Sequence, residues 1–226
     1  MTLQTLGGWA ALICAATYMV GFALLVTVLA PLGFGTAEID AAGVAAFIGA
    51  RPGVLIAWNS VIYIVNALAL AGLVVALHDR QARVTPGAAA VTRMFGTIWA
   101  TLVLGAGMMA NVAVERALHL FNTDPSAAAR TWEILHAVEL GLGGGNEIAG
   151  GVWIGGVSLA GLAGRSLSRW TAALGGATGA AGLATLIPPV GDLAGALFGL
   201  GAILWFLAIG CGLLVSGQSV SRAVQG

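Results

Sequence analysis

The chain has 226 residues, a formal net charge of zero, 59% hydrophobic residues and only 8% charged residues. A typical soluble domain carries about 25% charged residues, so a chain this poor in charge cannot cover a water-facing surface. The composition therefore excludes a soluble globular enzyme, a disordered chain and a nucleic-acid-binding protein, whose signature is a basic face. It predicts a polytopic membrane protein.

Six apolar segments are long enough to form transmembrane helices. A helix that crosses the hydrocarbon core of about 30 Å needs about 20 apolar residues. The expected fold is therefore an all-α membrane helix bundle, with one transmembrane domain over residues 1–226. Its six helices are expected over residues 9–30, 54–77, 94–114, 131–164, 170–187 and 193–215.

The arginines predict the orientation, because cytoplasmic loops of membrane proteins are enriched in basic residues. Arg51, Arg116 and Arg130 fall in loops on one side of the membrane. The other side, which includes both termini, holds Arg80, Arg83, Arg93, Arg165, Arg169 and Arg222. We therefore expect both termini in the cytoplasm and the chain in a bacterial inner (plasma) membrane.

Two outer connections carry structural signals of their own. Residues 41–50 are Ala-rich and weakly apolar, and they are too few to cross the membrane. We expect them to form a short helix that lies along the outer interface. Residues 122–125 are typical of a turn, with Asp124 or Ser126 as the cap of the helix that follows.

Glycine supplies 35 residues, and glycines recur at a spacing of four in the second half of the chain. They are Gly151/Gly155, Gly175/Gly179 and Gly191/Gly195/Gly199. In lipid, this spacing lets helix backbones approach closely. We expect these glycines to serve packing within the bundle. The alternative is that Gly-rich faces form a homo-oligomer or contact a partner in a membrane complex.

Ionisable residues at membrane depth are costly and by default mark function. A continuous helix over residues 131–164, at about 100° per residue, carries its polar side chains on one face. These are His136, Glu139, Asn146 and Glu147. Glu147 lies about 12 Å deeper than Glu139 on such a helix. Because no arginine lies at its depth, we expect Glu147 to be protonated at neutral pH.

The second and third helices carry similar polar stripes toward the outer side. The stripes are Asn59, Tyr63 and Asn66 on one helix and Asn111, Glu115 and His119 on the next. We expect an outward-facing polar pocket between helices two, three and four, in which Glu115 or His119 pairs with a polar residue of helix four. The plainer alternative is that the asparagines hydrogen-bond neighbouring helices and the other groups lie in wet headgroups.

A metal or haem site is a further alternative, although no cofactor is predicted by the leading interpretation. Glu133 and His136 match the E-x-x-H pattern of di-iron bundles, which use two such motifs where this chain has one. The side chains of suitable type for Zn²⁺ or iron are Glu115, His119, Glu133, His136 and Glu139. A haem would be held between His119 and His136.

A set of small and aromatic positions marks the second half of the chain. They are Glu147, Gly151–Trp153, Gly161, Arg165–Trp170, Leu174–Gly175, Phe198–Gly199 and Trp205 within the run 194–214. Over about residues 135–215 the chain thereby resembles an uncharacterised family of bacterial multi-pass membrane proteins, a domain of unknown function. The resemblance implies an integral membrane fold of six to seven helices and implies no activity.

No catalytic motif accompanies the polar stripes: the sequence has neither a nucleophile elbow in a Ser-His-Asp order nor an H-E-x-x-H motif. We therefore expect a non-enzymatic accessory, ligand-binding or sensing protein of the membrane. The first alternative is a small transporter or proton-coupled carrier with Glu139 and Glu147 as relay carboxylates. The second is a metal- or haem-binding redox protein that uses His119 and His136.

Overall fold

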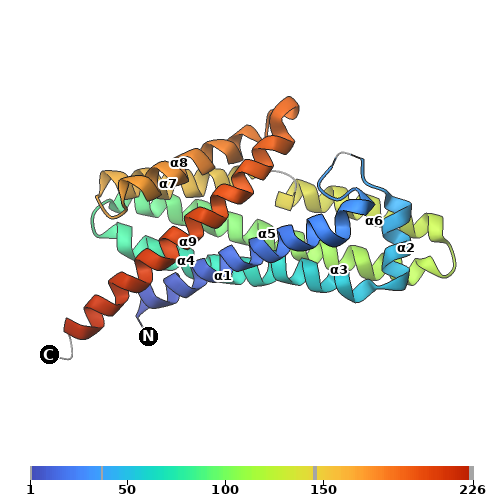
Figure 1. The fold of residues 1–226 in the computed structure, drawn as a ribbon, viewed down its shortest axis with the longest axis horizontal. Coiled ribbons are helices and arrows are strands. Elements are labelled where there is room, and N and C mark those ends of the chain that lie inside the picture. Colours follow the sequence, from blue (N-terminus) through green and yellow to red (C-terminus); the bar gives the residue numbers. More distant parts are fainter. Residues whose placement is uncertain (1, 37, 145–146, 224–226) are drawn as a thin grey trace. The chain divides into compact units, whose positions relative to one another are not determined.

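The computed structural model describes residues 2–36, 38–144 and 147–223 (Figure 1). These residues form helices and connections and contain no β-strand. The all-helical class expected from the sequence is therefore confirmed. Four helical stretches are long and apolar enough to cross a membrane, which indicates a membrane protein. They are Leu3–Leu32, Pro52–Ala82, Pro86–Phe121 and Pro188–Ser216.

Several α-helices continue into short π-helical or 3₁₀-helical segments. In chain order the elements are α1 (Leu3–Leu24), η1 (Leu25–Leu29), η2 (Ala30–Leu32), α2 (Ala41–Ala50), α3 (Pro52–Asn59), η3 (Ser60–Val65), α4 (Asn66–Ala82), α5 (Pro86–Phe121), α6 (Pro125–Glu139), η4 (Leu140–Gly144), α7 (Ile148–Ala163), α8 (Arg169–Ala184), η5 (Pro188–Val190) and α9 (Gly191–Ala223). A helix as long as α5, with 36 residues, extends about 54 Å. That length exceeds the hydrocarbon core of a bilayer, which is about 30 Å thick.

The expected continuous helix over residues 131–164 is interrupted in the structure. α6 ends at Glu139, η4 follows, and α7 begins only at Ile148. Gly143 has a φ of +136°, a conformation that residues with a side chain rarely adopt. The shared face expected for Glu139 and Glu147 assumed an unbroken helix and is therefore corrected.

The turn before α6 has a side-chain cap. The carboxylate of Asp124 accepts hydrogen bonds from the backbone N–H of Ala127 (2.9 Å) and from the hydroxyl of Ser126 (2.7 Å). The bond from Ala127 and then that from Ser126 hold the pKa of this exposed carboxyl below its usual range. Pro125 takes the first position of α6, where its missing N–H costs no hydrogen bond.

The chain divides into two compact units. Unit 1 comprises Met1–Ala16, Ala67–Thr101 and Glu147–Gly226, and unit 2 comprises Thr17–Asn66 and Leu102–Asn146. The division falls within α1, at the start of α4 and within α5, so the single helical domain expected from the sequence contains two separately packed units.

Unit 1 contains helices whose backbones meet at glycines. A Cβ atom added to Gly151 of α7 would lie 2.8 Å from the carbonyl oxygen of Gly179 in α8. A Cβ atom added to Gly179 would lie 2.7 Å from the carbonyl oxygen of Gly151. Such backbone-to-backbone approach is what small residues at a spacing of four allow between helices in lipid. At these two positions the glycines pack helices of the same chain.

A cluster of aromatic rings lies in the core of unit 1. Trp153 of α7 lies 5.5 Å from the ring of Trp205 in α9 and 5.6 Å from that of Trp99 in α5. The ring of Trp99 stacks on Phe206 at 6.3 Å. All four rings are buried. Rings of this size bury a large apolar area and pack with defined geometry, which ties α5, α7 and α9 together.

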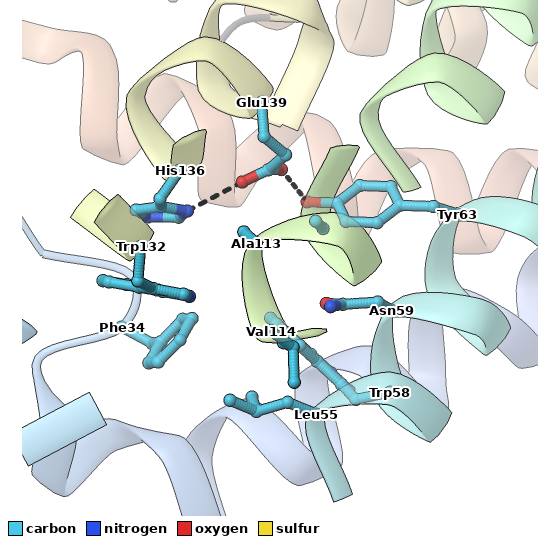
Figure 2. A pocket seen from close by; sticks show the side chains of 11 residues that line it. Phe34, Leu55, Trp58, Asn59, Tyr63, Ala113, Val114, Trp132, His136 and Glu139 are labelled. Atoms are coloured by element: carbon cyan, nitrogen blue, oxygen red, sulfur yellow. Dashed lines mark hydrogen bonds and ion pairs between the residues drawn. The ribbon is translucent and has the colours of Figure 1, made fainter. Parts of the chain in front are cut away.

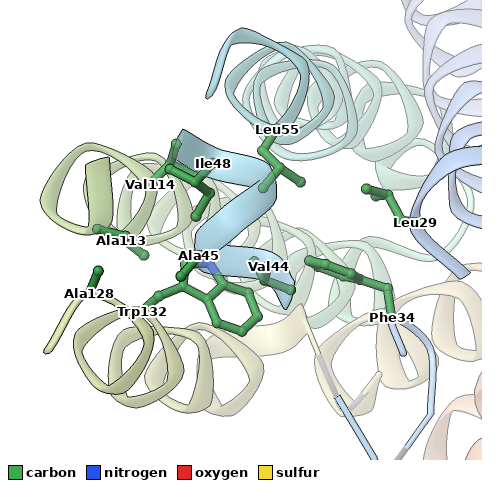
Figure 3. Packing of buried hydrophobic residues seen from close by; sticks show 11 residues of the cluster. Leu29, Phe34, Val44, Ala45, Ile48, Leu55, Ala113, Val114, Ala128 and Trp132 are labelled. Carbon is green, nitrogen blue, oxygen red and sulfur yellow. The ribbon is translucent and has the colours of Figure 1, made fainter. Parts of the chain in front are cut away.

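Unit 2 has its own apolar core, built around the short helix α2 (Figure 3). α2 covers the residues for which the sequence predicts a helix, and Asp40 caps it by accepting from the N–H of Gly43 at 2.9 Å. One face of α2 is buried against residues of the neighbouring helices. The core comprises Leu29, Phe34, Val44, Ala45, Ile48, Leu55, Ala113, Val114, Ala117, Ala128 and Trp132.

The glycine contact between α7 and α8 leads to a test with a matched control on the same helix. We expect Gly179→Ala to destabilise the protein by about 1–3 kcal/mol, because the new methyl group collides with backbone that cannot move aside. Gly176→Ala adds its methyl group where no atom lies within 4 Å, and it gains helix preference. Thermal unfolding in detergent measures both variants, and equal effects would contradict this packing.

Candidate functional site

Unit 2 encloses a small pocket of mixed character (Figure 2). Its volume is about 30 Å³, enough for one or two water molecules. The loop after η2 and the elements α3, η3, α5 and α6 all contribute to its wall. The lining residues are Phe34, Leu55, Trp58, Asn59, Tyr63, Ala110, Ala113, Val114, Trp132, His136 and Glu139.

Glu139, the last residue of α6, is the buried carboxyl group of this pocket and is only 2% exposed. The hydroxyl of Tyr63 donates to its Oε1 at 2.5 Å, and Nδ1 of His136 lies 2.8 Å from its Oε2 (Figure 2). Each carboxyl oxygen therefore meets a different partner. Hydrogen bonds to a charged group of this kind offset the cost of taking it out of water.

The contact between His136 and Glu139 places one hydrogen between the two side chains. With Glu139 ionised, its oxygens can only accept, and Nδ1 of the imidazole then carries that hydrogen. The indole of Trp132 stacks on the face of the imidazole of His136, with ring centroids 4.7 Å apart and an interplanar angle of 16°. Phe34 is a second aromatic neighbour, 5.8 Å from the imidazole centroid. His136 therefore has a fixed orientation toward the carboxylate.

Aromatic side chains form the apolar wall of the pocket. The ring of Phe34 makes edge contacts with Trp58 at 5.6 Å and with Trp132 at 5.8 Å. The indole N–H of Trp58 donates to the carbonyl oxygen of Gly21 at 3.3 Å, which fixes that ring in turn. A buried indole usually finds such a partner. The wall is thus a connected set of rings beside the buried carboxylate.

Asn59 supplies the other polar group of the pocket. It ends α3, four residues before Tyr63, so both side chains lie on the same side of this helical stretch. Asn59 is 5% exposed, and its amide makes no hydrogen bond with the part of the chain that the structure describes. The amide is not one of the fully buried polar groups that lack a partner, so its atoms reach open space at the pocket. Figure 2 shows this amide on the wall of the pocket.

The helical backbone changes at Tyr63 and directly after Glu139. η3, a π-helical turn rich in β-branched residues, carries Tyr63, whereas the segment η4 after Glu139 is kinked at Gly143. β-branched side chains have a reduced preference for the α-helix. Single π-helical turns of this kind occur frequently at functional sites.

Two of the asparagines expected in the pocket have other partners. Asn66 is buried and donates to the hydroxyl of Thr17 at 2.7 Å. Asn111 donates to the hydroxyl of Ser60 at 3.2 Å, while its Oδ1 is buried without a partner among the described residues. Both amides connect neighbouring helices and do not line the pocket.

The remaining expected site residues are separate from the pocket. Glu115, His119 and Glu133 are exposed. Instead of charged groups, α5 presents alanines and a valine to the pocket. Asn146 lies outside the described residues. Glu147 belongs to unit 1, where its backbone N–H donates to the hydroxyl of Thr185 at 3.2 Å.

The described residues contain no group of side chains arranged as ligands of a metal ion or a haem. Among the described residues, no three side chains of His, Cys, Asp or Glu come together in a way that could hold a metal ion. Of the five ligands considered from the sequence, only His136 and Glu139 are in contact. His119 is exposed on α5, whereas His136 is enclosed between Trp132 and the carboxylate. The residues present do not fit either group.

The aromatic wall is the part of the site that sequence reasoning missed. The spacing i, i+4, i+7 places Trp132, His136 and Glu139 on one face of a helix. This spacing could have predicted that Trp132 lies at the same site as the other two residues. Phe34 lies in an irregular loop where no periodicity applies.

No family model, no curated protein and no solved structure matches the chain. The resemblance of residues 135–215 to a family of multi-pass membrane proteins therefore stays a prediction, and the site is interpreted from its own geometry.

Substitutions at Glu139 and Tyr63 measure how much each hydrogen bond of this carboxyl group contributes to stability. We expect Glu139→Leu to destabilise the protein by about 2–4 kcal/mol, because it leaves the Tyr63 hydroxyl and His136 without their acceptor. Glu139→Gln retains an acceptor and should cost less. Tyr63→Phe should cost about 1–3 kcal/mol, since it removes one donor to a charged group.

The control for these variants is Glu115→Gln on the exposed face of α5, which should change stability by less than about 0.5 kcal/mol. Thermal or denaturant unfolding in detergent measures the series. If Glu139→Leu and Glu115→Gln were equally mild, the buried carboxylate would not organise this unit.

Proposed function

We propose that the chain is an integral membrane protein that binds a small polar ligand in the pocket around Glu139 and acts as a ligand-binding, sensing or accessory subunit. The observation that carries the proposal is a buried carboxyl group with two hydrogen-bond partners, in a pocket also lined by an amide that has no partner among the described residues. A polar ligand in the pocket would supply that partner. Buried ionisable groups cost stability, and proteins retain them chiefly at functional sites.

The proposal includes an arrangement in the membrane. Six spans, both termini in the cytoplasm and a location in a bacterial inner membrane follow from the arginine distribution and from the six apolar segments. The fourth of these spans is interrupted between α6 and α7. α7 and α8 have 16 residues each, which suits short or tilted neighbours of the longer helices.

An outer position for the pocket is supported by the charged surface of unit 2. Exposed charged or titratable side chains cannot face hydrocarbon without a large cost. Two of the helices that line the pocket, α5 and α6, carry such side chains, so this part of the two helices suits the headgroup region or water. The exposed residues are Glu115, Arg116, His119, Arg130 and Glu133.

A second candidate function is proton-coupled transport. It is favoured by the buried contact between His136 and Glu139, since histidine–carboxylate pairs serve as proton relays in membrane carriers. In that case the pocket is one binding site along a transport pathway across the membrane. The ligand then passes through the pocket, whereas in the first function its binding is sensed by a partner protein. Uptake into vesicles, absent in the first function, distinguishes the two.

The proposed binding function is tested with solutes of at most three heavy atoms. The purified protein is heated in detergent with ammonium chloride, methanol or sodium formate, and with sodium chloride at equal ionic strength as the reference. We expect at least one solute to raise the unfolding temperature, because a ligand that binds only the folded state stabilises it.

The variant Asn59→Leu removes the unpartnered amide and fills its space, so it should not respond to that solute. Glu115→Gln, whose substitution is exposed, should respond like the unaltered chain. Equal responses of the unaltered chain and Asn59→Leu to all three solutes, or no response at all, would refute binding in this pocket.

A further inference from the structure

We propose that the ligand of this pocket is a water-sized monovalent cation of the ammonium type, taken up in exchange for a proton on His136. The inference rests on the proposed binding function, because it concerns the same pocket and names the class of ligand. Its basis is the juxtaposition of a carboxylate, an unpartnered amide and aromatic rings around a space of about 30 Å³.

The size of the pocket sets the first limit. A space that holds one or two water molecules accepts ammonium or methylammonium and rejects tetramethylammonium, which has five heavy atoms. Because the wall consists of rings that contact one another, the space cannot expand by the movement of a single side chain. Choline-sized cations are therefore too large for the pocket as it stands.

The charge of the pocket sets the second limit. With Glu139 ionised and His136 neutral, the described lining residues carry a net charge of minus one, since Tyr63 donates its hydroxyl hydrogen and stays neutral. α2 contributes no titratable group, and neither does α3. The titratable groups of α5 and α6 other than His136 and Glu139 include Glu115, Arg116, His119, Arg130 and Glu133, which are exposed. A bound cation neutralises the pocket.

The chemistry of the wall favours an ammonium-type cation over an alkali ion. Each N–H of ammonium needs an acceptor, and the amide oxygen of Asn59 and the carboxylate of Glu139 line the same space. Aromatic rings attract the remaining positive charge through their π faces. An alkali ion exchanges its hydration shell for a ring of oxygens, as in potassium-channel filters, and this pocket offers too few.

His136 is the side chain that loses a proton when the cation enters the pocket. Its Nδ1–H stays bonded to Glu139 in both states, so the proton that leaves or returns is the one on Nε2. When the imidazole is doubly protonated, its positive charge already balances the carboxylate. Entry of one ammonium ion then requires the loss of one proton, and the total charge of the pocket does not change.

Two measurements on the unaltered full chain test the inference. In weakly buffered detergent solution, ammonium chloride should release up to one proton for each protein chain, whereas sodium chloride should release none. The apparent affinity for ammonium should fall as the pH is lowered, by at most about tenfold for each pH unit, because one proton competes with one cation. Methylammonium should behave similarly, and tetramethylammonium should have no effect.

Two variants complete the design. His136→Gln retains an N–H that can donate to Glu139, so it should bind ammonium without releasing a proton and without this pH dependence. Asn59→Leu should lose binding. Ammonium binding by the unaltered chain without proton release would overturn the exchange, and an equal response to potassium chloride would overturn the ammonium-type assignment.

Failure of the inference differs from failure of the proposed function. If methanol or formate stabilises the unaltered chain and not Asn59→Leu while ammonium does neither, the pocket binds a ligand of another class and the inference is wrong. If no small solute distinguishes these two proteins, both the inference and the binding function are wrong.

Discussion

Burial of one carboxyl group, that of Glu139, is the constraint on which the architecture of unit 2 depends. A carboxylate removed from water must be met by donors, and Tyr63 and His136 supply one for each oxygen. This requirement ties the end of α6 to η3 and fixes the imidazole against Trp132. The surrounding apolar core can then pack around the pair, because this carboxyl group and the imidazole already have partners.

The two units satisfy the demands of an apolar environment in different ways. In unit 1, α7 and α8 approach so closely at Gly151 and Gly179 that backbone meets backbone, and a cluster of aromatic rings is buried in the same unit. Unit 1 also has a cavity of about 340 Å³, whose lining includes Gln4, Asp79 and Arg80. Unit 2 has a much smaller pocket of about 30 Å³, lined by aromatic rings and polar groups. The close glycine packing and the pocket that we propose as a binding site thus lie in different units of the chain.

Composition and apolar length were sufficient to predict an all-helical membrane protein, because burial in lipid leaves few other solutions for the backbone. The polar stripes expected from the sequence include Tyr63, His136 and Glu139, which the structure brings together around one pocket. Glu115 and His119 were assigned to the same pocket because helical spacing does not distinguish a face toward a pocket from one toward water. The break at Gly143 depends on a local backbone conformation that periodicity does not contain. The six spans and the orientation of the termini stay predictions.

The central claim, that Glu139 is an ionised carboxylate held by two donors inside the protein, is open to direct observation by infrared difference spectroscopy. Spectra of the unaltered protein and of Glu139→Gln are compared at neutral pH in detergent. The account predicts that the substitution removes the two stretching bands of an ionised carboxylate and leaves the region of protonated carboxyl groups unchanged. Loss of the carbonyl band of a protonated carboxyl group instead would contradict the charge assignment on which the pocket and its cation both depend.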